Sequence, residues 1–537
     1  MRLVTTDCIP LSAIPHVTRL FADYTSHFER VGQFYAHPPL TRDWFPQESR
    51  SLHFDAGRRA RVTQILERQN RAWGASAATL DSIRRLAAGA AVVVTGQQVG
   101  LFGGPLFALY KALSAIRLAA ELTQGGVECV PVFWLATEDH DLAEVNHATL
   151  PGLEGGLVKL TSAAVGGPGA PVGTVRFAAE IEAVVAEAAR LLGDTPTTRF
   201  LRECYRPDET LGSAFARLFS RLFAHSGVVL LDASDPDLHA LAVPIYQAAI
   251  AGAAALDQEL LERGRALEAA GYHVQVKVTA SSTLLFGIHE GGRLPVHRAN
   301  HAFTLGEEKL SQEELLRRIA AAPENFSANV LLRPVVQDYL LPTLAYIGGP
   351  SEVAYFAQAA VPYQRLLQRV TPILPRFSAT LVEPRAQQLL ERYQLGVADS
   401  FHDPERLRSL LASRALPADV SRSFEAAERS LKESLAVVEG SLGKLDPTLA
   451  EATRRAAAKM EYQLNRLRQR AARAELRRSQ EVARHADLLS ASLYPNHDLQ
   501  ERQLAGVFFT ARYGTEVLLR LYDATHAACP DHQVIRL

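Results

Sequence analysis

The chain has 537 residues, which is too many for one hydrophobic core, so we expect roughly two to four domains. Hydrophobic residues make up 47% and charged residues 21% of the sequence, a balance that excludes overall disorder. The net charge of −1 excludes a global attraction to nucleic acid or to an anionic membrane, and neither is expected as a partner.

Four cysteines are spread along the chain at Cys8, Cys129, Cys204 and Cys529. They form no CxxC pair, which disfavours a zinc ribbon, a dithiol redox motif and a disulfide scaffold. The first 17 residues contain two prolines and no unbroken apolar stretch, so we do not expect a signal peptide. No run approaches the ~20 apolar residues of a membrane-spanning helix. A cytoplasmic location is therefore expected.

A βαβ unit is predicted after about 85 mostly helical residues. The β-branched run 90–95 is typical of a buried parallel strand, and the glycine-rich turn 95–105 follows it. Pro105 stands where a helix would begin, and a second buried strand is predicted over 127–136. Residues 1–150 are therefore assigned to N-terminal helices and the first half of a Rossmann-like parallel-sheet core.

Two stretches interrupt this α/β pattern and are interpreted as connective insertions. The second contains hairpin-like strands at His273–Val278 and Leu284–His289. The pattern resumes with a strand at Leu344–Ile347 and a strand-like run at Ile373–Val382. The expected boundaries are 151–226 for the first insertion, 227–271 for the core, 272–332 for the second insertion and 333–384 for the second half of the core.

Charged helical sequence dominates from about Pro384. Two apolar seams step by four and three residues around Asp446-Pro447, namely Leu431, Leu435, Val438, Leu442 and Leu445, then Met460, Leu464, Leu467, Ala471 and Ala474. They predict an antiparallel helical hairpin or coiled coil, which either closes on itself or pairs with another subunit. Residues 385–492 are assigned to it, and 493–537 to a segment that packs on the core.

The turn after the first strand is the first candidate site, because open α/β sheets bind ligands beyond the carboxyl ends of their strands. Thr95 opens this turn, and Gly96 and Gly100 let its backbone approach a ligand closely. The following helix offers free N–H groups suited to phosphate or carboxylate. Gln97 and Gln98 can both donate and accept hydrogen bonds. The alternative is a tight strand-to-helix turn without a ligand.

A polar run follows the second strand and contains Glu138, Asp139, His140, Asp141, Glu144, Asn146 and His147. Such a run is costly to bury, and Asp139, His140 and Asp141 are candidates for general acid and base catalysis. If the segment is helical, His140, Glu144 and His147 share one face and could bind a metal. A solvated loop with a helix cap is the remaining alternative.

Two polar segments follow later strands. Ser351 and Glu352 either begin a helix as its cap or hold a substrate carboxylate. Arg376 and Ser378 either clamp an anion or leave the arginine in a surface salt bridge. Both segments are therefore candidate substrate contacts.

The last candidate segment comes just after the helical hairpin. Tyr494 could stack on a base and Arg502 could contact a phosphate, with Asn496 between them in the chain. The alternative is an ordinary helix end followed by a new helix. A nucleotide contact is therefore one of two interpretations of this segment.

Five segments occur in a specific order: TGQQVGLFGGPLFALYK (Thr95–Lys111), VPVFWLATEDHDLAEVNH (Val130–His147), RPVVQDYLLPTLAYIGGPSEVAYFAQ (Arg333–Gln358), PRFSATLVEPR (Pro375–Arg385) and LYPNHDLQER (Leu493–Arg502). Together they resemble the cysteine ligase family of bacillithiol biosynthesis. The resemblance spans nearly the whole chain and is weakest in the two insertions.

The resemblance implies an α/β fold whose Rossmann-like core is related to class I aminoacyl-tRNA synthetases, with a helical coiled-coil domain that forms a homodimer. It also implies that cysteine is added to the glucosamine amine of glucosaminyl malate, the last step of bacillithiol biosynthesis. ATP, or ADP, would be bound, and the cysteine carboxyl would be activated as an adenylate. The synthetase motifs HIGH and KMSKS are absent, and Gln97 and Gln98 stand at the equivalent place after the first strand.

Each candidate residue then receives an expected role. The expected catalytic residues are Asp139, His140 and Asp141. The expected substrate-binding residues are Thr95, Gly96, Gln97, Gln98, Gly100, Trp134, Ser351, Glu352, Arg376 and Ser378. The expected nucleotide-binding residues are Tyr494, Asn496 and Arg502, and no metal site is expected. Two alternatives remain: a metal-dependent hydrolase using His140, Glu144 and His147, and a non-enzymatic coiled-coil scaffold.

Overall fold

The computed structural model describes residues 5–153, 155–165, 169–289, 292–300, 302–478, 480–525 and 531–537. The chain divides into two compact units. The core unit comprises Met1–Leu150, Val158–Ala379 and Glu501–Gln533, and the helical unit comprises Pro151–Leu157, Thr380–Gln500 and Val534–Leu537. The chain passes from the core unit to the helical unit within strand β16 (Ala379–Val382), slightly before the boundary expected at 384, and returns at the start of helix α20 (Gln500–Gln503), after the one expected at 492. The last four residues of the chain, in strand β17 (His532–Arg536) and beyond, again belong to the helical unit.

A five-stranded parallel sheet forms the centre of the core unit, in the order β15-β14-β2-β3-β8. Its strands are β2 (Ala91–Gln97), β3 (Cys129–Leu135), β8 (Val229–Asp232), β14 (Thr343–Gly348) and β15 (Ile373–Pro375). β3 is buried along its whole length, as expected for a parallel strand covered on both faces. The predicted α/β fold with a Rossmann-like parallel sheet is confirmed, although the predicted run Ile373–Val382 is divided between β15 and β16.

The helix after β2 covers this sheet. α5 (Phe107–Gln124) packs on β2 and β3 and buries most of its residues. It begins two residues after Pro105 rather than at it, with Leu106 as its N-cap. The elements that precede the sheet are β1 (Thr5–Ile9), α1 (Arg19–Ser26), α2 (Phe45–Ser51), α3 (Ala56–Ala72) and α4 (Ala77–Ala87).

The described residues of the first predicted insertion form short strands and helices. α8 begins with a Thr195–Thr198 capping box and Pro196, which are ordinary helix-start signals. The elements are β4 (His147–Pro151), β5 (Leu157–Thr161), β6 (Ala164–Val165), β7 (Arg176–Phe177), α7 (Ile181–Leu192), α8 (Pro196–Cys204) and α9 (Leu211–Leu222).

The second predicted insertion contains an antiparallel five-stranded sheet in the order β12-β11-β10-β9-β13. Its elements are β9 (Ser282–His289), β10 (Gly292–Ala299), β11 (Ala302–Leu305), β12 (Glu308–Ser311), α12 (Gln312–Ala321) and β13 (Phe326–Ala328). The strand predicted at His273–Val278 is wrong. There the backbone of Val276 pairs with the side-chain amide of Gln358, at 2.9 and 2.8 Å, instead of with a strand.

Four helices flank the second insertion in the chain: α10 (Pro236–Ala251) and α11 (Ala253–Ala269) before it, α13 (Arg333–Leu340) and α14 (Pro350–Leu367) after it. Among the described helices, none is by itself long and apolar enough to cross a membrane, and the bent pair α10–α11 meets that test by length and composition only.

Cys129 and Cys204 are buried free thiols, whereas Cys8 is disulfide-bonded, which the cysteine spacing did not predict.

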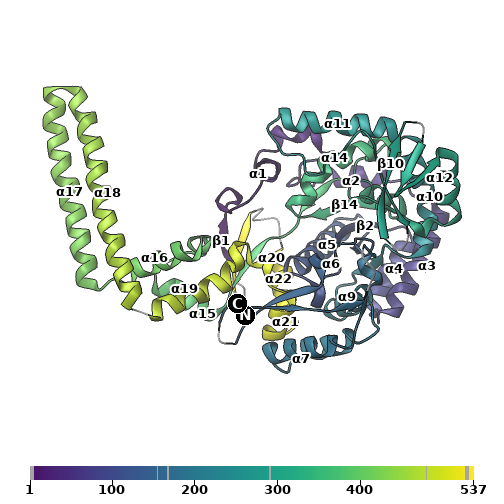
Figure 1. Cartoon of the computed structure of the whole chain (residues 1–537), viewed down its shortest axis with the longest axis horizontal. Helices are drawn as coiled ribbons and strands as arrows, with labels where there is room; N and C mark the ends of the chain where they lie inside the picture. Colours follow the sequence, from purple (N-terminus) through teal and green to yellow (C-terminus); the bar gives the residue numbers. More distant parts are fainter. Residues whose placement is uncertain are drawn as a thin grey trace. The chain divides into compact units, whose positions relative to one another are not determined.

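The helical unit contains the predicted hairpin, formed by α17 (Ala418–Leu445) and α18 (Pro447–Arg478) running side by side (Figure 1). Asp446 ends α17 and Pro447 begins α18, so the predicted break is confirmed. Arg454 pairs with Glu439, and a second ion pair also crosses between the helices. The other helices of this unit are α15 (Pro384–Arg392), α16 (Pro404–Arg414) and α19 (Gln480–Leu493).

The last part of the chain consists of α20 (Gln500–Gln503), α21 (Gly506–Tyr513), α22 (Glu516–Ala524) and β17. Within the core unit, α21 and α22 pack against α5. Gly506 allows this approach, because a Cβ at that position would lie 2.5 Å from the Leu109 side chain.

Candidate active site

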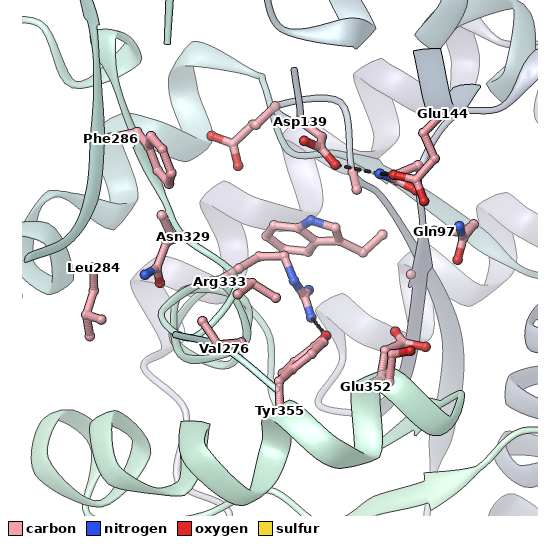
Figure 2. A pocket seen from close by; sticks show the side chains of 18 of the residues that line it. Gln97, Asp139, Glu144, Val276, Leu284, Phe286, Asn329, Arg333, Glu352 and Tyr355 are labelled. Atoms are coloured by element: carbon pink, nitrogen blue, oxygen red, sulfur yellow. Dashed lines mark hydrogen bonds between the residues drawn. The ribbon is translucent and has the colours of Figure 1, made fainter. Parts of the chain in front are cut away.

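A cavity of about 660 Å³ lies in the core unit at the carboxyl ends of β2, β3 and β14, where open α/β sheets bind ligands. Its wall also includes β9, β10 and the starts of α13 and α14. Charged and aromatic side chains from these elements meet around one space (Figure 2). The charged lining residues are Glu138, Asp139, Glu144, Glu352, Lys111, Lys277, Arg293, Arg333, Arg376 and Arg502.

The cavity brings together only part of the predicted site. The predicted residues that line it are Gly96, Gln97, Gln98, Trp134, Asp139, Ser351, Glu352, Arg376 and Arg502. The predicted residues that do not line it are Thr95, Gly100, His140, Asp141, Ser378, Tyr494 and Asn496.

A buried lysine fixes the side-chain amide of Gln97. Lys111 Nζ donates to the backbone oxygen of Gly96 at 2.7 Å and to Gln97 Oε1 at 2.9 Å. It also lies 2.5 Å from Glu352 Oε2, so all three of its donors are used. Since the lysine takes the amide oxygen, Gln97 Nε2 remains as a donor on the cavity side. This orientation follows from the hydrogen-bond network.

In the side-chain amide of Gln98 the nitrogen, and not the oxygen, is taken by neighbouring side chains. Its Nε2 donates to Asp139 Oδ2 at 2.6 Å and to Glu144 Oε2 at 2.8 Å. Figure 2 shows the carboxylates of Asp139 and Glu144 meeting at this amide nitrogen. Adjacent glutamines therefore have opposite polarity, with a donor remaining on Gln97 and an acceptor on Gln98.

Burial lowers the pKa of the Lys111 ammonium, although the neighbouring Glu352 carboxylate acts in the opposite direction. Lys111 is 4% exposed, so its charge must be balanced by local partners. Lys111 was not among the predicted site residues, because one lysine on a helix is usually solvated. Its place at the end of the Thr95–Lys111 segment was the available signal.

The Glu352 carboxylate contributes to the capping of α14, whose N-cap residue is Gly349. It accepts hydrogen bonds from the backbone N–H of Gly349 at 2.7 Å and from the Tyr346 hydroxyl at 2.6 Å. With Lys111 as a third partner, this carboxylate is occupied by the protein itself. Glu352 lies in the first turn of α14 as the cap interpretation expected, but the N-cap is Gly349 and not Ser351, which is exposed on the cavity wall.

Two arginines place positive charge in the cavity. Arg333 donates to the Tyr355 hydroxyl at 3.1 Å (Figure 2). Its guanidinium also lies over the rings of Trp134 and Tyr346. Arg293 donates to the Ala328 backbone oxygen at 2.9 Å. Its guanidinium also lies over the Phe286 ring, 4.0 Å from the centroid. Burial lowers the pKa of the Arg293 guanidinium, and nearby acidic groups act on this pKa in the opposite direction.

Sequence reasoning missed both arginines as site residues. Arg333 begins one of the five segments that carry the family resemblance, so a signal for it existed. Arg293 lies on β10 in the second insertion, which the resemblance covers poorly, and no motif marks it. Trp134 was predicted, and it adds an indole N–H that is buried without a hydrogen-bond partner among the described residues.

The polar run after β3 is not helical throughout. α6 extends only over Leu142–Val145, and β4 begins at His147. His140, Glu144 and His147 therefore do not share one helix face, which was the basis of the alternative with a metal site. Within the described part of the chain, no group of three His, Cys, Asp or Glu side chains is placed to hold a metal ion. The arrangement of side chains on which the alternative of a metal-dependent hydrolase was based is therefore not observed among the described residues.

Asp139, His140 and Asp141 separate into three environments. Asp139 lines the cavity and accepts from Gln98 and from the backbone N–H of His140. The His140 side chain is 44% exposed, and Arg293 Nη1 donates to its Nδ1 at 3.3 Å. Asp141 is the N-cap of α6. Only Asp139 of the three is placed to meet a ligand in the cavity.

The glycine-rich turn is more enclosed than expected. The backbone N–H of Gly103 donates to the Tyr205 hydroxyl at 3.1 Å, and that of Leu106 donates to the backbone oxygen of Leu504 at 2.8 Å. The N–H groups of Gly100 and Gly104 also donate to backbone oxygens of the same turn. These four N–H groups are therefore not free to hold an anion, and one of them, that of Leu106, belongs to the start of α5, where free N–H groups were predicted.

Thr95 and Gly100 have structural roles in and beside this turn. The Thr95 hydroxyl donates to the Ile347 backbone oxygen at 2.9 Å, which links β2 to β14. A Cβ on Gly100 would lie 2.9 Å from the Cα of Gly104, which has a φ of 72°. Glycine is thus required where the turn passes close to itself.

Arg376 and Ser378 are held by a buried glutamate. Arg376 Nη2 lies 2.6 Å from Glu501 Oε1, and both side chains are almost fully buried. The Ser378 hydroxyl is 3.0 Å from each Glu501 oxygen and 2.7 Å from His532 Nδ1. Burial alone would raise the pKa of Glu501, but Arg376 and its hydrogen bonds lower it overall. Arg376 is therefore neither a surface salt bridge nor an unpaired anion clamp.

The predicted nucleotide contacts differ in accessibility. Tyr494, in the helical unit, is 4% exposed, and its ring centroid is 5.3 Å from that of Phe401. That burial leaves no open ring face for a base, so the predicted stacking is not supported. Asn496 is exposed and has a φ of 52°, while Arg502, in the core unit, lines the cavity.

Comparison with known proteins gives matches along nearly the whole chain. Residues 4–377 match the bacillithiol biosynthesis BshC N-terminal Rossmann-like domain, and residues 379–537 match the bacillithiol biosynthesis BshC C-terminal coiled-coil domain. A protein of Koribacter versatilis named “Putative cysteine ligase BshC” is 50% identical over 531 residues, covering 99% of each chain. Proteins of the same name from Solibacter usitatus and Symbiobacterium thermophilum are 37% and 33% identical, covering 98% and 94% of this chain and 99% and 94% of their own.

Proposed function

The chain belongs to the bacillithiol biosynthesis BshC family, and from that premise we propose that it joins the carboxyl group of L-cysteine to the glucosamine amine of glucosaminyl malate. The observation that carries this proposal is the cavity at the strand ends, where an oriented amide donor, buried cations and carboxylates face one space. A coiled-coil scaffold without enzymatic activity would leave that arrangement unexplained.

The cations suit the acceptor substrate. Glucosaminyl malate carries two carboxylates on its malate portion, and arginine is the side chain best matched to a carboxylate. Arg333 and Arg293 line the cavity and are already held in place by Tyr355 and Ala328. We assign the malate carboxylates to these two guanidinium groups, with the unpartnered Trp134 N–H as an additional donor.

Gln97 is assigned to the reacting carbonyl. When an amine attacks a carboxyl carbon, negative charge develops on the carbonyl oxygen, and a donor already aimed at it lowers the barrier. Lys111 holds the amide oxygen of Gln97, so its Nε2 need not reorient during the reaction. Gln97 would therefore stabilise the oxyanion, which gives a role to the glutamine in this turn.

ATP, or ADP, is the proposed activating nucleotide. Its phosphates require cationic donors, and the cavity wall supplies Lys277 and Arg502 in addition to the two arginines assigned to malate. These residues fit a polyphosphate by charge, and they would hold it near the cysteine carboxyl. When bound, ATP would supply a leaving group on that carboxyl.

A homodimer through the hairpin is also part of the proposal. Several large apolar side chains of α17 and α18 are exposed in the single chain, namely Val437, Val438, Leu445, Met460, Tyr462 and Leu467. Apolar surface of this kind is favourable to bury against a second copy. Sedimentation should then give twice the chain mass, and Leu467→Glu with Leu445→Glu should shift it toward the monomer.

The proposed reaction can be tested with purified protein, glucosaminyl malate, L-cysteine and ATP. Mass spectrometry should detect the thiol product only when all three small molecules are present. L-Serine in place of cysteine is the matched control for the thiol, and omission of ATP or its replacement by ADP tests nucleotide use. Absence of the amide product under every nucleotide condition would overturn the proposal.

A further inference from the structure

Glu138 differs from the other carboxylates that line the cavity. Asp139 and Glu144 accept hydrogen bonds from Gln98, and Glu352 is occupied by Lys111 and its helix cap. Glu138 Oε1, in contrast, is buried without a hydrogen-bond partner among the described residues. It lies just beyond the carboxyl end of β3, and its side chain is 15% exposed. Since Oε1 is buried against His239, the other carboxylate oxygen, Oε2, which accepts no hydrogen bond from the described residues, is the one left for a ligand in the cavity.

A buried histidine lies directly behind this carboxylate. His239, on α10, is 4% exposed, and its Nε2 is 3.2 Å from Glu138 Oε1, close enough for an ion pair but outside hydrogen-bond geometry. Its Nδ1 is also buried without a partner among the described residues. Burying a polar ring in this way costs stability and is not explained by packing alone. The pair therefore has the features of a functional arrangement.

Several charged and titratable groups surround Glu138. Burial raises its pKa above the ordinary value, and that effect outweighs the opposing influence of nearby positive charge. The surrounding groups are His239 and Tyr246 from α10, Asp232 from β8, Arg293 from β10, Arg333 from α13 and the adjacent Asp139. A carboxylate with a raised pKa is a stronger proton acceptor near neutral pH.

We propose that Glu138 binds the ammonium group of the acceptor substrate and takes one proton from it, while His239 positions the carboxylate. This inference rests on the proposed function, in which that group is the amine of a hexosamine. One N–H bond of the ammonium breaks, the proton moves to a carboxylate oxygen of Glu138, and the electron pair stays on nitrogen. The neutral amine can then attack the activated carboxyl carbon. Glu138 is a catalytic residue, and His239 is a positioning residue.

The direct test is Glu138→Gln, which keeps the shape of the side chain but cannot accept the proton. Turnover of the amide-forming reaction should fall about 10²–10⁴-fold, the usual range for loss of a general base. Glu138→Asp should retain more activity than Glu138→Gln, because the carboxylate remains. Thermal midpoints of both variants are measured beside wild type. Wild-type turnover in a folded Glu138→Gln protein would overturn the proposal.

His239 requires a readout that a purely structural role would not change. The carboxylate must be ionised to accept a proton, so kcat/KM should fall as pH drops through the pKa of Glu138. His239 lowers that pKa, and His239→Phe should therefore move this acid limb to higher pH. His225→Gln, at an exposed histidine outside the cavity, is the control for loss of a histidine. An acid limb unchanged in His239→Phe would refute the positioning role.

Failure of the proposed function can be distinguished from failure of this inference. If wild type forms no amide product, binding of glucosaminyl malate measured by calorimetry still tests the ammonium contact. Glu138→Gln should then bind at least 10-fold more weakly than wild type, since about 1.4 kcal/mol or more of a charged hydrogen bond is lost. Equal binding by the two proteins would overturn the contact, whichever reaction the cavity performs.

Discussion

Replacement of Lys111 with methionine should affect both the stability of the core unit and the orientation of Gln97. The Lys111 ammonium contacts Gly96 O, Gln97 Oε1 and Glu352 Oε2 at 2.7, 2.9 and 2.5 Å. Methionine retains most of the side-chain volume but leaves the Glu352 carboxylate buried without its cation. Breaking a buried ion pair by removing one partner costs about 3–5 kcal/mol. The free energy of unfolding of Lys111→Met should fall by that order.

Urea denaturation of wild type, Lys111→Met, Glu352→Gln and the double variant measures this coupling. The double variant should recover part of the loss, because it no longer buries an uncompensated charge. Its amide-forming turnover should nevertheless remain about 10²–10³-fold below wild type, since Gln97 has lost the contact that orients its donor. Wild-type stability in Lys111→Met, or wild-type turnover in the stable double variant, would refute this reasoning.

Three further predictions concern separate parts of the core unit. Gln97→Glu keeps an acceptor for Lys111 but removes the N–H donor, so turnover should fall about 10²–10³-fold with little change in thermal midpoint. Arg333→Met should raise the KM for glucosaminyl malate about 10–100-fold and leave that for cysteine unchanged, and the reverse result would reassign this arginine. Burial lowers the pKa of His532 to about 4 from an ordinary value of 6.5. The unfolded chain therefore binds more protons between these values, and stability should fall by about 1.4 kcal/mol per pH unit as pH drops across this window. His532→Gln should remove much of that slope in urea midpoints measured from pH 7 to pH 4, and an unchanged slope would contradict it.

The parallel strands were predictable because strands that are buried on both faces consist mainly of neighbouring apolar residues in the sequence. β2 and β3 are continuous apolar runs, as strands covered on both faces must be. The helical hairpin was predictable for a similar reason, since Asp446-Pro447 interrupts two regular apolar seams. Segment 273–278 was wrongly predicted as a strand, because the backbone of Val276 pairs with the side chain of Gln358, far away in the chain.

The site was only partly predictable because its functional pairs join distant segments. Gln97 was selected from its turn, but the direction of its amide depends on Lys111 in the following helix. Glu138 is placed opposite His239 by the packing of α10, and no spacing in the sequence relates them. His140 and Asp141 were selected as part of a charged run, yet neither lines the cavity, and Asp141 instead caps α6.

The most direct test of amide formation in this cavity uses L-cysteine labelled with heavy oxygen at both carboxyl positions. Wild type is incubated with this cysteine, glucosaminyl malate and ATP, and the products are analysed by mass spectrometry. We predict an amide product that retains one heavy oxygen, with the other transferred to the released nucleotide, and the loss of both signals in Gln97→Glu. A labelled amide beside unlabelled nucleotide and unlabelled phosphate would contradict activation through the cysteine carboxyl, and absence of the amide would contradict the proposed reaction itself.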